Sequence, residues 1–177
     1  MLRPSLRIRP VTLADAGSTA ALLNRIISSG GLTSMEETLS EEAQSHYILG
    51  FPDTELFLQA EETSSGCLAG LQSLEPHRPN EPALAHVGEI STFIAEGFRG
   101  QGVGSCLMKA TLEAAAGKGY RKVMALIRAD NPGALAFYAR HRFQRVGLLT
   151  AHTRFRDTFL DQVLMERSIP APTGSRR

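Results

Sequence analysis

Three glycines at alternate positions, Gly100, Gly102 and Gly104, mark the stretch of this chain best suited to bind a ligand. They follow an apolar, strand-like run at residues 88–95 and precede residues 103–116, whose apolar side chains recur at helical spacing. Glycine lets a backbone approach a ligand closely, and the first turn of a helix offers unpaired N–H groups and the positive end of its dipole. The pattern therefore predicts a phosphate site, to which Arg99 adds a permanent charge with a forked donor geometry.

Glycine turns serve several phosphate ligands, and the spacing separates them. A P-loop needs a lysine after its last glycine, but Ser105 follows Gly104. The dinucleotide fingerprint Gly-x-Gly-x-x-Gly would need a glycine at position 105 or 107, and Ser105 and Leu107 stand there. The pattern that fits is Arg/Gln-x-x-Gly-x-Gly/Ala, at residues 99–104. A glycine-rich turn that binds no ligand is the alternative reading of the same residues.

A second motif lies at residues 127–138, which read IRADNPGALAFY. Asn131 and Pro132 predict a helix start, because an amide side chain caps well and proline suits the first helical position. Tyr138 then falls about two turns into the helix. Together, residues 99–104 and 127–138 resemble the two signatures of the GNAT acetyltransferase superfamily. The likeness runs from residue 8 to residue 167, and the C-terminal half is most similar to phosphinothricin and amino-acid N-acetyltransferases.

The resemblance implies acetyl-CoA as co-substrate and, as acceptor, a primary amine of a small metabolite or amino acid. It places the pyrophosphate on the glycine turn, the pantetheine arm along the preceding strand and Tyr138 near the thioester sulfur. The implied coenzyme A contacts are Phe93, Ile94, Ala95, Arg99, Gly100, Gln101, Gly102, Val103, Gly104, Ser105 and Asn131. Two alternatives stay open, a non-catalytic acyl-CoA sensor or scaffold and an enzyme that acetylates protein N-termini or lysines.

Glu89 and Tyr138 are the predicted catalytic residues. Acyl transfer to an amine needs a deprotonated amine, a stabilised oxyanion and a proton for the departing thiolate. Glu89 lies ten residues before Arg99 on the strand that enters the turn, where several members of the resembled family carry a general base, and Tyr138 is the implied proton donor. The alternatives are a solvated or salt-bridged Glu89, with a base acting through water, and a Tyr138 that only packs.

The chain departs from the family after the second motif. The family usually has Leu-Gly-Phe there, and this chain has His141, Arg142 and Phe143. Glycine at the middle position normally takes the left-handed conformation that ends a helix, which costs other residues about 1 kcal/mol. Either the helix ends differently in this chain, or Arg142 tolerates the strain.

Composition indicates an ordinary soluble globular protein. The 177 residues are 42% hydrophobic and 21% charged with a net charge of +1, so neither nucleic acid nor a membrane is expected as a partner. No apolar run is long enough for a signal peptide or a membrane span. Cys67 and Cys106 are expected to be buried thiols in a reducing cytoplasm, and the histidines show no metal-ligand spacing. A homodimer stays open.

The order of the expected elements predicts a mixed α/β (α+β) fold, with one GNAT domain at residues 1–168 and a frayed tail at residues 169–177. A strand, a helix and a strand around the glycine turn imply a parallel crossover. The expected sheet has six or seven strands flanked by about four helices. The expected strands are residues 6–11, 56–60, 67–74, 84–95, 120–128, 143–150 and 158–167, and the expected helices are residues 16–28, 36–49, 103–116 and 133–141.

Overall fold

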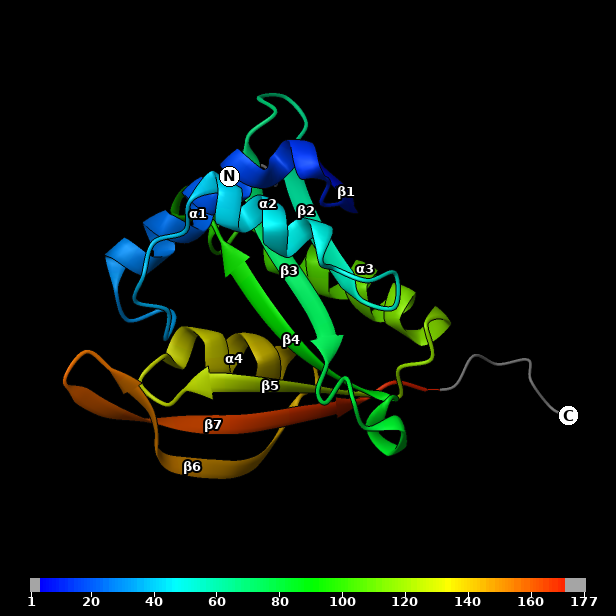
Figure 1. Cartoon of the computed structure of the whole chain (residues 1–177), viewed down its shortest axis with the longest axis vertical. Helices are drawn as coiled ribbons and strands as arrows, with labels where there is room; N and C mark the ends of the chain where they lie inside the picture. Colours follow the sequence, from blue (N-terminus) through cyan, green and yellow to red (C-terminus); the bar gives the residue numbers. More distant parts are fainter. Residues whose placement is uncertain (1–3, 171–177) are drawn as a thin grey trace, which may run out of the picture.

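A seven-stranded mixed sheet forms the centre of the computed structural model, which describes residues 4–170. Its strand order is β1-β2-β3-β4-β5-β7-β6 (Figure 1). β4 (Val87–Ile94) and β5 (Lys122–Arg128) run parallel, joined by α3 (Val103–Gly117), and the other neighbours are antiparallel. The predicted mixed α/β fold and its crossover are thus confirmed. The remaining strands are β1 (Leu6–Pro10), β2 (Leu56–Glu62), β3 (Leu68–Pro76), β6 (Gln144–Phe155) and β7 (Thr158–Ser168).

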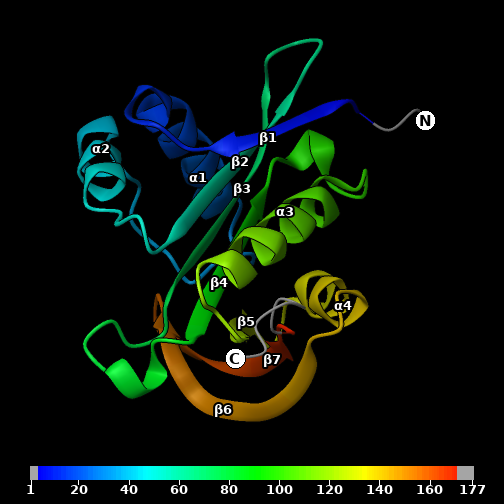
Figure 2. The same ribbon diagram turned by 90° about the vertical axis from the view of Figure 1, so that its right-hand side faces the viewer.

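Helices cover both faces of the sheet (Figure 2). α1 (Ala16–Ser29) and α2 (Glu41–Leu49) lie on one face, where Leu22, Leu23 and Ile26 pack with Leu71 of β3. α3 and α4 (Pro132–Arg140) lie on the other, where their apolar side chains pack against β3, β4, β5 and β7. Because strand side chains alternate between faces, β3 and β4 each contribute to hydrophobic clusters on both sides of the sheet.

β4 and β5 pair over only three residues and then separate (Figure 1). Glu89 is the last paired residue of β4, opposite Met124. Past it, the backbone groups of Ile90, Thr92 and Ile94 point toward the gap, because those of the alternate residues bind β3. The Ala95 N–H shows this alternation, since it donates to the Ala69 carbonyl at 3.0 Å. The sheet therefore offers an unpaired strand edge beside the glycine turn.

Several predicted boundaries differ from the observed ones. The second helix begins at Glu41 and not at residue 36, because the Ser40 side chain caps it by accepting from the Ala43 N–H at 3.0 Å. β4 begins at Val87, since Pro82–Leu84 form a short 3-10 turn before it. β6 continues to Phe155, past the expected end at residue 150, with register shifts against β7. Of the predicted tail, residues 171–177 lie outside the described part of the chain.

The expectation that both cysteines are buried is wrong. Cys106 lies on the outer side of α3, because the buried stripe of that helix runs through Val103, Leu107 and Thr111. Cys67 is exposed in the turn that joins β2 to β3. Within residues 4–170, no helix is long and apolar enough to cross a membrane.

Candidate active site

The glycine turn presents an open backbone at the N-terminus of α3. Gly100 and Gly102 have φ of +73° and +89°, the left-handed region that glycine adopts freely. A Cβ built on either one meets nothing within 4 Å. The first helical bond is donated by Cys106 to the Gly102 carbonyl, so the N–H groups of residues 103–105 have no acceptor within the described chain. These free donors and the helix dipole make the turn a candidate anion site.

Gly104 makes a packing contact that Gly100 and Gly102 lack. Its φ is not positive, and a Cβ there would lie 2.9 Å from a ring carbon of Phe137 on α4. The absent side chain therefore lets α3 and α4 approach each other. The two helices also meet through Ser105 Oγ and His141 Nε2, which lie 3.0 Å apart.

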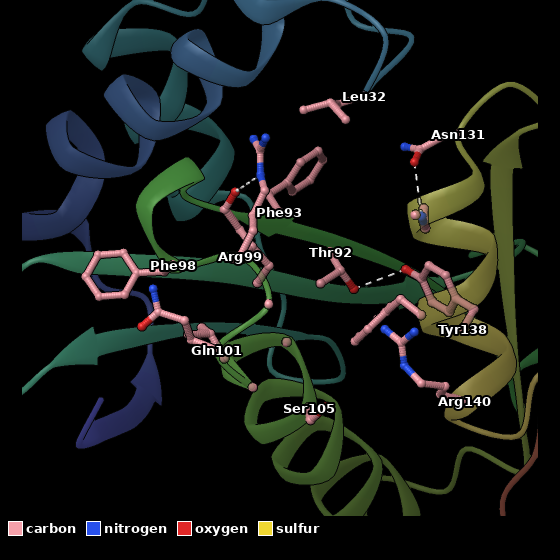
Figure 3. Close-up of a pocket in the computed structure, with 18 of the residues that line it drawn as sticks. Leu32, Thr92, Phe93, Phe98, Arg99, Gln101, Ser105, Asn131, Tyr138 and Arg140 are labelled. Atoms are coloured by element: carbon pink, nitrogen blue, oxygen red, sulfur yellow. Dashed lines mark hydrogen bonds between the residues drawn. The ribbon is translucent and has the colours of Figure 1, made fainter. Parts of the chain in front are cut away.

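A cavity of about 890 Å³ extends from the turn through the gap between β4 and β5. Figure 3 shows Arg99, Phe93 and Leu32 on one side of it, Asn131 and Tyr138 on the α4 side, and Ser105 on α3. Its lining includes side chains from both faces of the sheet, among them Ile26 of α1 and Phe137 of α4. The predicted contacts that line it are Phe93, Ile94, Arg99, Gly100, Gln101, Gly102, Val103, Gly104, Ser105 and Asn131.

The backbone groups of Phe93 and Ala95 point away from the gap between β4 and β5. Ala95 does not line the cavity, and its N–H and C=O are used by Ala69 and by the Phe98 N–H. The backbone of Phe93 faces β3, where Phe93 is the register partner of Leu71. Its side chain lines the cavity instead. Of the three residues expected to offer backbone groups, only Ile94 points its N–H toward the gap.

Arg99 and Asn131 each keep polar groups available toward the cavity. Arg99 Nε donates to the Ile94 carbonyl at 3.2 Å, and the terminal nitrogens of its guanidinium have no acceptor among residues 4–170. Asn131 Oδ1 accepts from the Ala134 N–H at 3.0 Å and so caps α4, while its amide nitrogen has no acceptor in the described structure. Both residues thus combine a local structural bond with free donors.

Tyr138 is held in place by the way α4 ends. The Phe143 N–H donates to the Tyr138 carbonyl and the Arg142 N–H to the Ala139 carbonyl, which is a Schellman motif. Arg142 has φ of +63°, so it adopts the left-handed conformation in place of glycine. Of the two alternatives raised by the sequence, Arg142 tolerates the strain. The motif packs the Phe143 ring against the Tyr138 ring, with centroids 5.0 Å apart.

The Tyr138 hydroxyl lies beside Thr92, near the C-terminal end of β4. Tyr138 is 5% exposed, and its hydroxyl oxygen is 3.0 Å from Thr92 Oγ1. Burial raises the pKa of Tyr138 to about 12, although the hydrogen bond from Thr92 acts in the opposite direction. The phenol therefore stays protonated at neutral pH. No motif in the sequence points to Thr92, although strand alternation places it on the same face as Ile90 and Ile94.

Tyr138 lines the cavity, but Glu89 does not. It lies three residues before Thr92, about 10 Å along the strand, and on the opposite face. Its side chain is 37% exposed, and its Oε2 is 3.3 Å from His77 Nδ1. Glu75 is its register partner on β3 and accepts from the Tyr47 hydroxyl at 2.8 Å. Glu89 therefore stands where the β4–β5 gap opens, on the side of α1 and α2.

A glycine turn at a helix N-terminus, beside a gap between two parallel strands, has donors and space that suit an extended ligand carrying phosphate. Residues 26–143 match the Acetyltransferase (GNAT) family. The chain belongs to this family and is an N-acetyltransferase.

Curated relatives and a solved structure agree with this assignment. The chain is 31% identical over 134 residues to the Bacillus subtilis (strain 168) protein YwnH, provisionally named a phosphinothricin acetyltransferase, with 76% of this chain and 81% of that protein covered. It is 25% identical to the phosphinothricin N-acetyltransferase of Streptomyces coelicolor, with 80% and 84% covered. A crystal structure provisionally described as a phosphinothricin N-acetyltransferase superposes with a TM-score of 0.85 at 28% identity, with 94% and 99% covered.

Proposed function

We propose that this enzyme transfers the acetyl group of acetyl-CoA to the primary amine of a small metabolite or amino acid. The observation that carries the proposal is the cavity through the β4–β5 gap, whose lining includes both the glycine turn and Tyr138. An acyl-CoA needs both features, since its charged pyrophosphate and its thioester lie at opposite ends of the pantetheine arm. Residues 1–168 are the proposed catalytic unit, and the cytoplasm is the proposed compartment.

Coenzyme A has complementary partners along this cavity. The N–H groups of residues 103–105 and the free guanidinium nitrogens of Arg99 suit the pyrophosphate. The unpaired edge of β4 at Thr92 and Ile94 suits the amides of the pantetheine arm, as an added strand would. The free amide nitrogen of Asn131 is a further donor on the α4 side. Gly100 and Gly102 leave this approach unobstructed.

Tyr138 and Glu89 are the proposed acid and base. The amine attacks the acetyl carbonyl carbon, the carbon–sulfur bond breaks, and the sulfur takes the Tyr138 proton while Glu89 accepts the amine proton. Because Glu89 is about 10 Å along the strand from Thr92 and on the opposite face, its proton transfer runs through water. The acceptor then enters from the α1 and α2 side, and the coenzyme from the α3 and α4 side.

A small amine is the proposed acceptor class, supported by the relatives named as phosphinothricin N-acetyltransferases. The test is release of free thiol from acetyl-CoA with a panel of amines. The panel contains phosphinothricin, the free amino acids, a polyamine, a peptide with a free N-terminal alanine and an N-terminally blocked peptide with a lysine. We expect the fastest release with a free amino acid or its phosphinate analogue.

Other outcomes separate the alternatives. Faster release with a peptide than with any free amine would replace the small-molecule acceptor by a protein acceptor. Coenzyme A binding in calorimetry, without thiol release on any amine, would support a sensor or scaffold. Absence of coenzyme A binding would overturn the site itself.

A further inference from the structure

Three polar side chains form a chain of hydrogen bonds from the middle of the sheet to the cavity. Gln72 of β3 and Thr92 of β4 are cross-strand partners, and the Gln72 amide nitrogen donates to Thr92 Oγ1 at 2.8 Å. Thr92 Oγ1 in turn lies 3.0 Å from the Tyr138 hydroxyl (Figure 3). Gln72 is 0% exposed and does not line the cavity. Any effect of Gln72 on a bound ligand therefore passes through Thr92.

Counting donors and acceptors shows in which direction the hydrogen bonds between Gln72, Thr92 and Tyr138 run. The Gln72 amide nitrogen can only donate, so Thr92 Oγ1 accepts from it. If Tyr138 also donated to Thr92, the Thr92 proton would have no acceptor among the described residues. If Thr92 donates to Tyr138, the Gln72 N–H and the Thr92 O–H of these two hydrogen bonds both have an acceptor. The Tyr138 proton is then held only by the Ile90 carbonyl, at a long 3.5 Å.

We propose that Gln72 and Thr92 are positioning residues that keep the Tyr138 proton directed into the cavity, toward the coenzyme A sulfur. This inference rests on the proposed function, in which Tyr138 is the acid. Thr92 supplies a donor to the tyrosine oxygen, and Gln72 orients the Thr92 hydroxyl for that role by donating to one of its two lone pairs.

The same hydrogen bonds stabilise the Tyr138 phenolate that the proton transfer leaves behind. As the carbon–sulfur bond breaks, its electron pair stays on sulfur, the Tyr138 O–H bond breaks and a sulfur–hydrogen bond forms. The phenolate left behind accepts the Thr92 hydroxyl proton in a charge-assisted hydrogen bond. Water then returns a proton to Tyr138, in exchange for the one that the base removed from the amine. Without Thr92, a buried phenolate would have no side-chain donor in the described structure, which is costly in an apolar site.

The test compares Thr92→Val and Gln72→Met with the parent enzyme, using the amine that gives the fastest thiol release. Both changes keep the side-chain size and remove the hydrogen bond. We expect Thr92→Val to lower kcat about 10-fold or more, and Gln72→Met to lower it less, because the Thr92 hydroxyl is still present. The KM for acetyl-CoA and the calorimetric Kd for coenzyme A should stay within about 3-fold, since neither change touches the anion site.

Two variants control for packing. Thr92→Ser keeps the hydroxyl and should recover most of the kcat lost in Thr92→Val. Thr111→Val removes the hydroxyl of a fully buried threonine in α3, whose oxygen has no partner within residues 4–170. It should leave kcat unchanged. A loss of kcat in Thr111→Val equal to that in Thr92→Val would show that the effect is general packing, and would overturn the proposal.

A double substitution separates this inference from the proposed acid. If Thr92 acts through Tyr138, adding Thr92→Val to Tyr138→Phe should lower kcat no further. Independent, multiplying losses would overturn the positioning role while leaving Tyr138 as the acid. A Tyr138→Phe enzyme with unchanged kcat would remove the acid itself, and the inference with it.

Discussion

Substitution of the three glycines by alanine distinguishes ligand binding from helix packing. At Gly102 the left-handed backbone costs alanine about 1–2 kcal/mol, offset by about 0.4–1 kcal/mol because alanine restricts the unfolded chain. We expect a net destabilisation of about 1 kcal/mol, which lowers Tm by about 2–4 °C in a chain of this size. Gly100, with φ of +73°, should behave in the same way.

The effect of Gly102→Ala on coenzyme A should be larger than its effect on stability. A Cβ there enters space that is open in the ligand-free turn, where the pyrophosphate is proposed to lie. Loss of one charge-assisted hydrogen bond is worth about 1.5–3 kcal/mol, and 1.4 kcal/mol is tenfold in Kd. We therefore expect the Kd for coenzyme A to rise by at least about 10-fold.

Gly104→Ala should show the reverse pattern. Its Cβ would lie 2.9 Å from the Phe137 ring, and overpacking of this kind typically destabilises by about 1–3 kcal/mol. The Kd should change less than in Gly102→Ala, and adding Phe137→Leu should restore part of the lost Tm. Gly97→Ala is the matched control, because Gly97 has no positive φ and its Cβ would meet nothing within 4 Å.

Calorimetry with coenzyme A and thermal unfolding of the ligand-free variants provide both measurements. A Kd within twofold of the parent in Gly102→Ala would refute the assignment of the turn to the pyrophosphate. An unchanged Tm together with a large rise in Kd in Gly104→Ala would refute the packing role of that glycine.

Three further predictions concern the base, the helix end and acid stability. Glu89→Gln should lower kcat about 10²-fold near neutral pH with the coenzyme A Kd preserved, and near-full activity at every pH would contradict the base. Arg142→Gly should raise the free energy of unfolding in urea by about 0.5–1 kcal/mol, since it relieves a φ of +63°; a loss of stability would mean that the Arg142 side chain outweighs the strain. The Arg9 guanidinium holds the pKa of Asp15 well below its usual range. The ionised Asp15 therefore stabilises the folded protein above about pH 4, and this contribution is lost as pH falls through the folded pKa. Urea unfolding between pH 2 and 6 should show a weaker pH dependence for Asp15→Asn, and an identical slope would contradict this.

The sequence predicted the order of the elements well because its signals are local. The turn glycines, the cap at Asn131 and the apolar run of β5 each act within a few residues, and the structure confirms the mixed sheet and the parallel crossover. The start of α2 was missed because residues 36–45 are polar and weakly periodic, so the Ser40 cap decides the boundary. The predicted burial of the cysteines was wrong because it rested on the average tendency of cysteine to be buried. Cys106 lies on the exposed face of α3 instead.

The site was predicted less completely than the fold, because its details depend on contacts between distant segments. Gly102 and Gly104 look equivalent in the sequence, and only the approach of Phe137 separates their roles. Gln72 and Thr92 are 20 residues apart, and their hydrogen bond follows from the β3–β4 register. A register of this kind is set by packing across the whole sheet.

The positions of Glu89 and Tyr138 explain why the gap between β4 and β5 matters for the proposed chemistry. The two side chains lie on opposite faces of the sheet, so no reaction could connect them if β4 and β5 stayed paired. Pairing ends at Glu89, and past that point the cavity is lined from both faces, by Ile26 of α1 and by Tyr138 of α4. An acetyl group held in the gap can therefore be attacked from the Glu89 side while its sulfur leaves toward Tyr138. The same opening supplies the coenzyme with an unpaired strand edge, so the break in pairing provides both the binding edge and the route between acid and base.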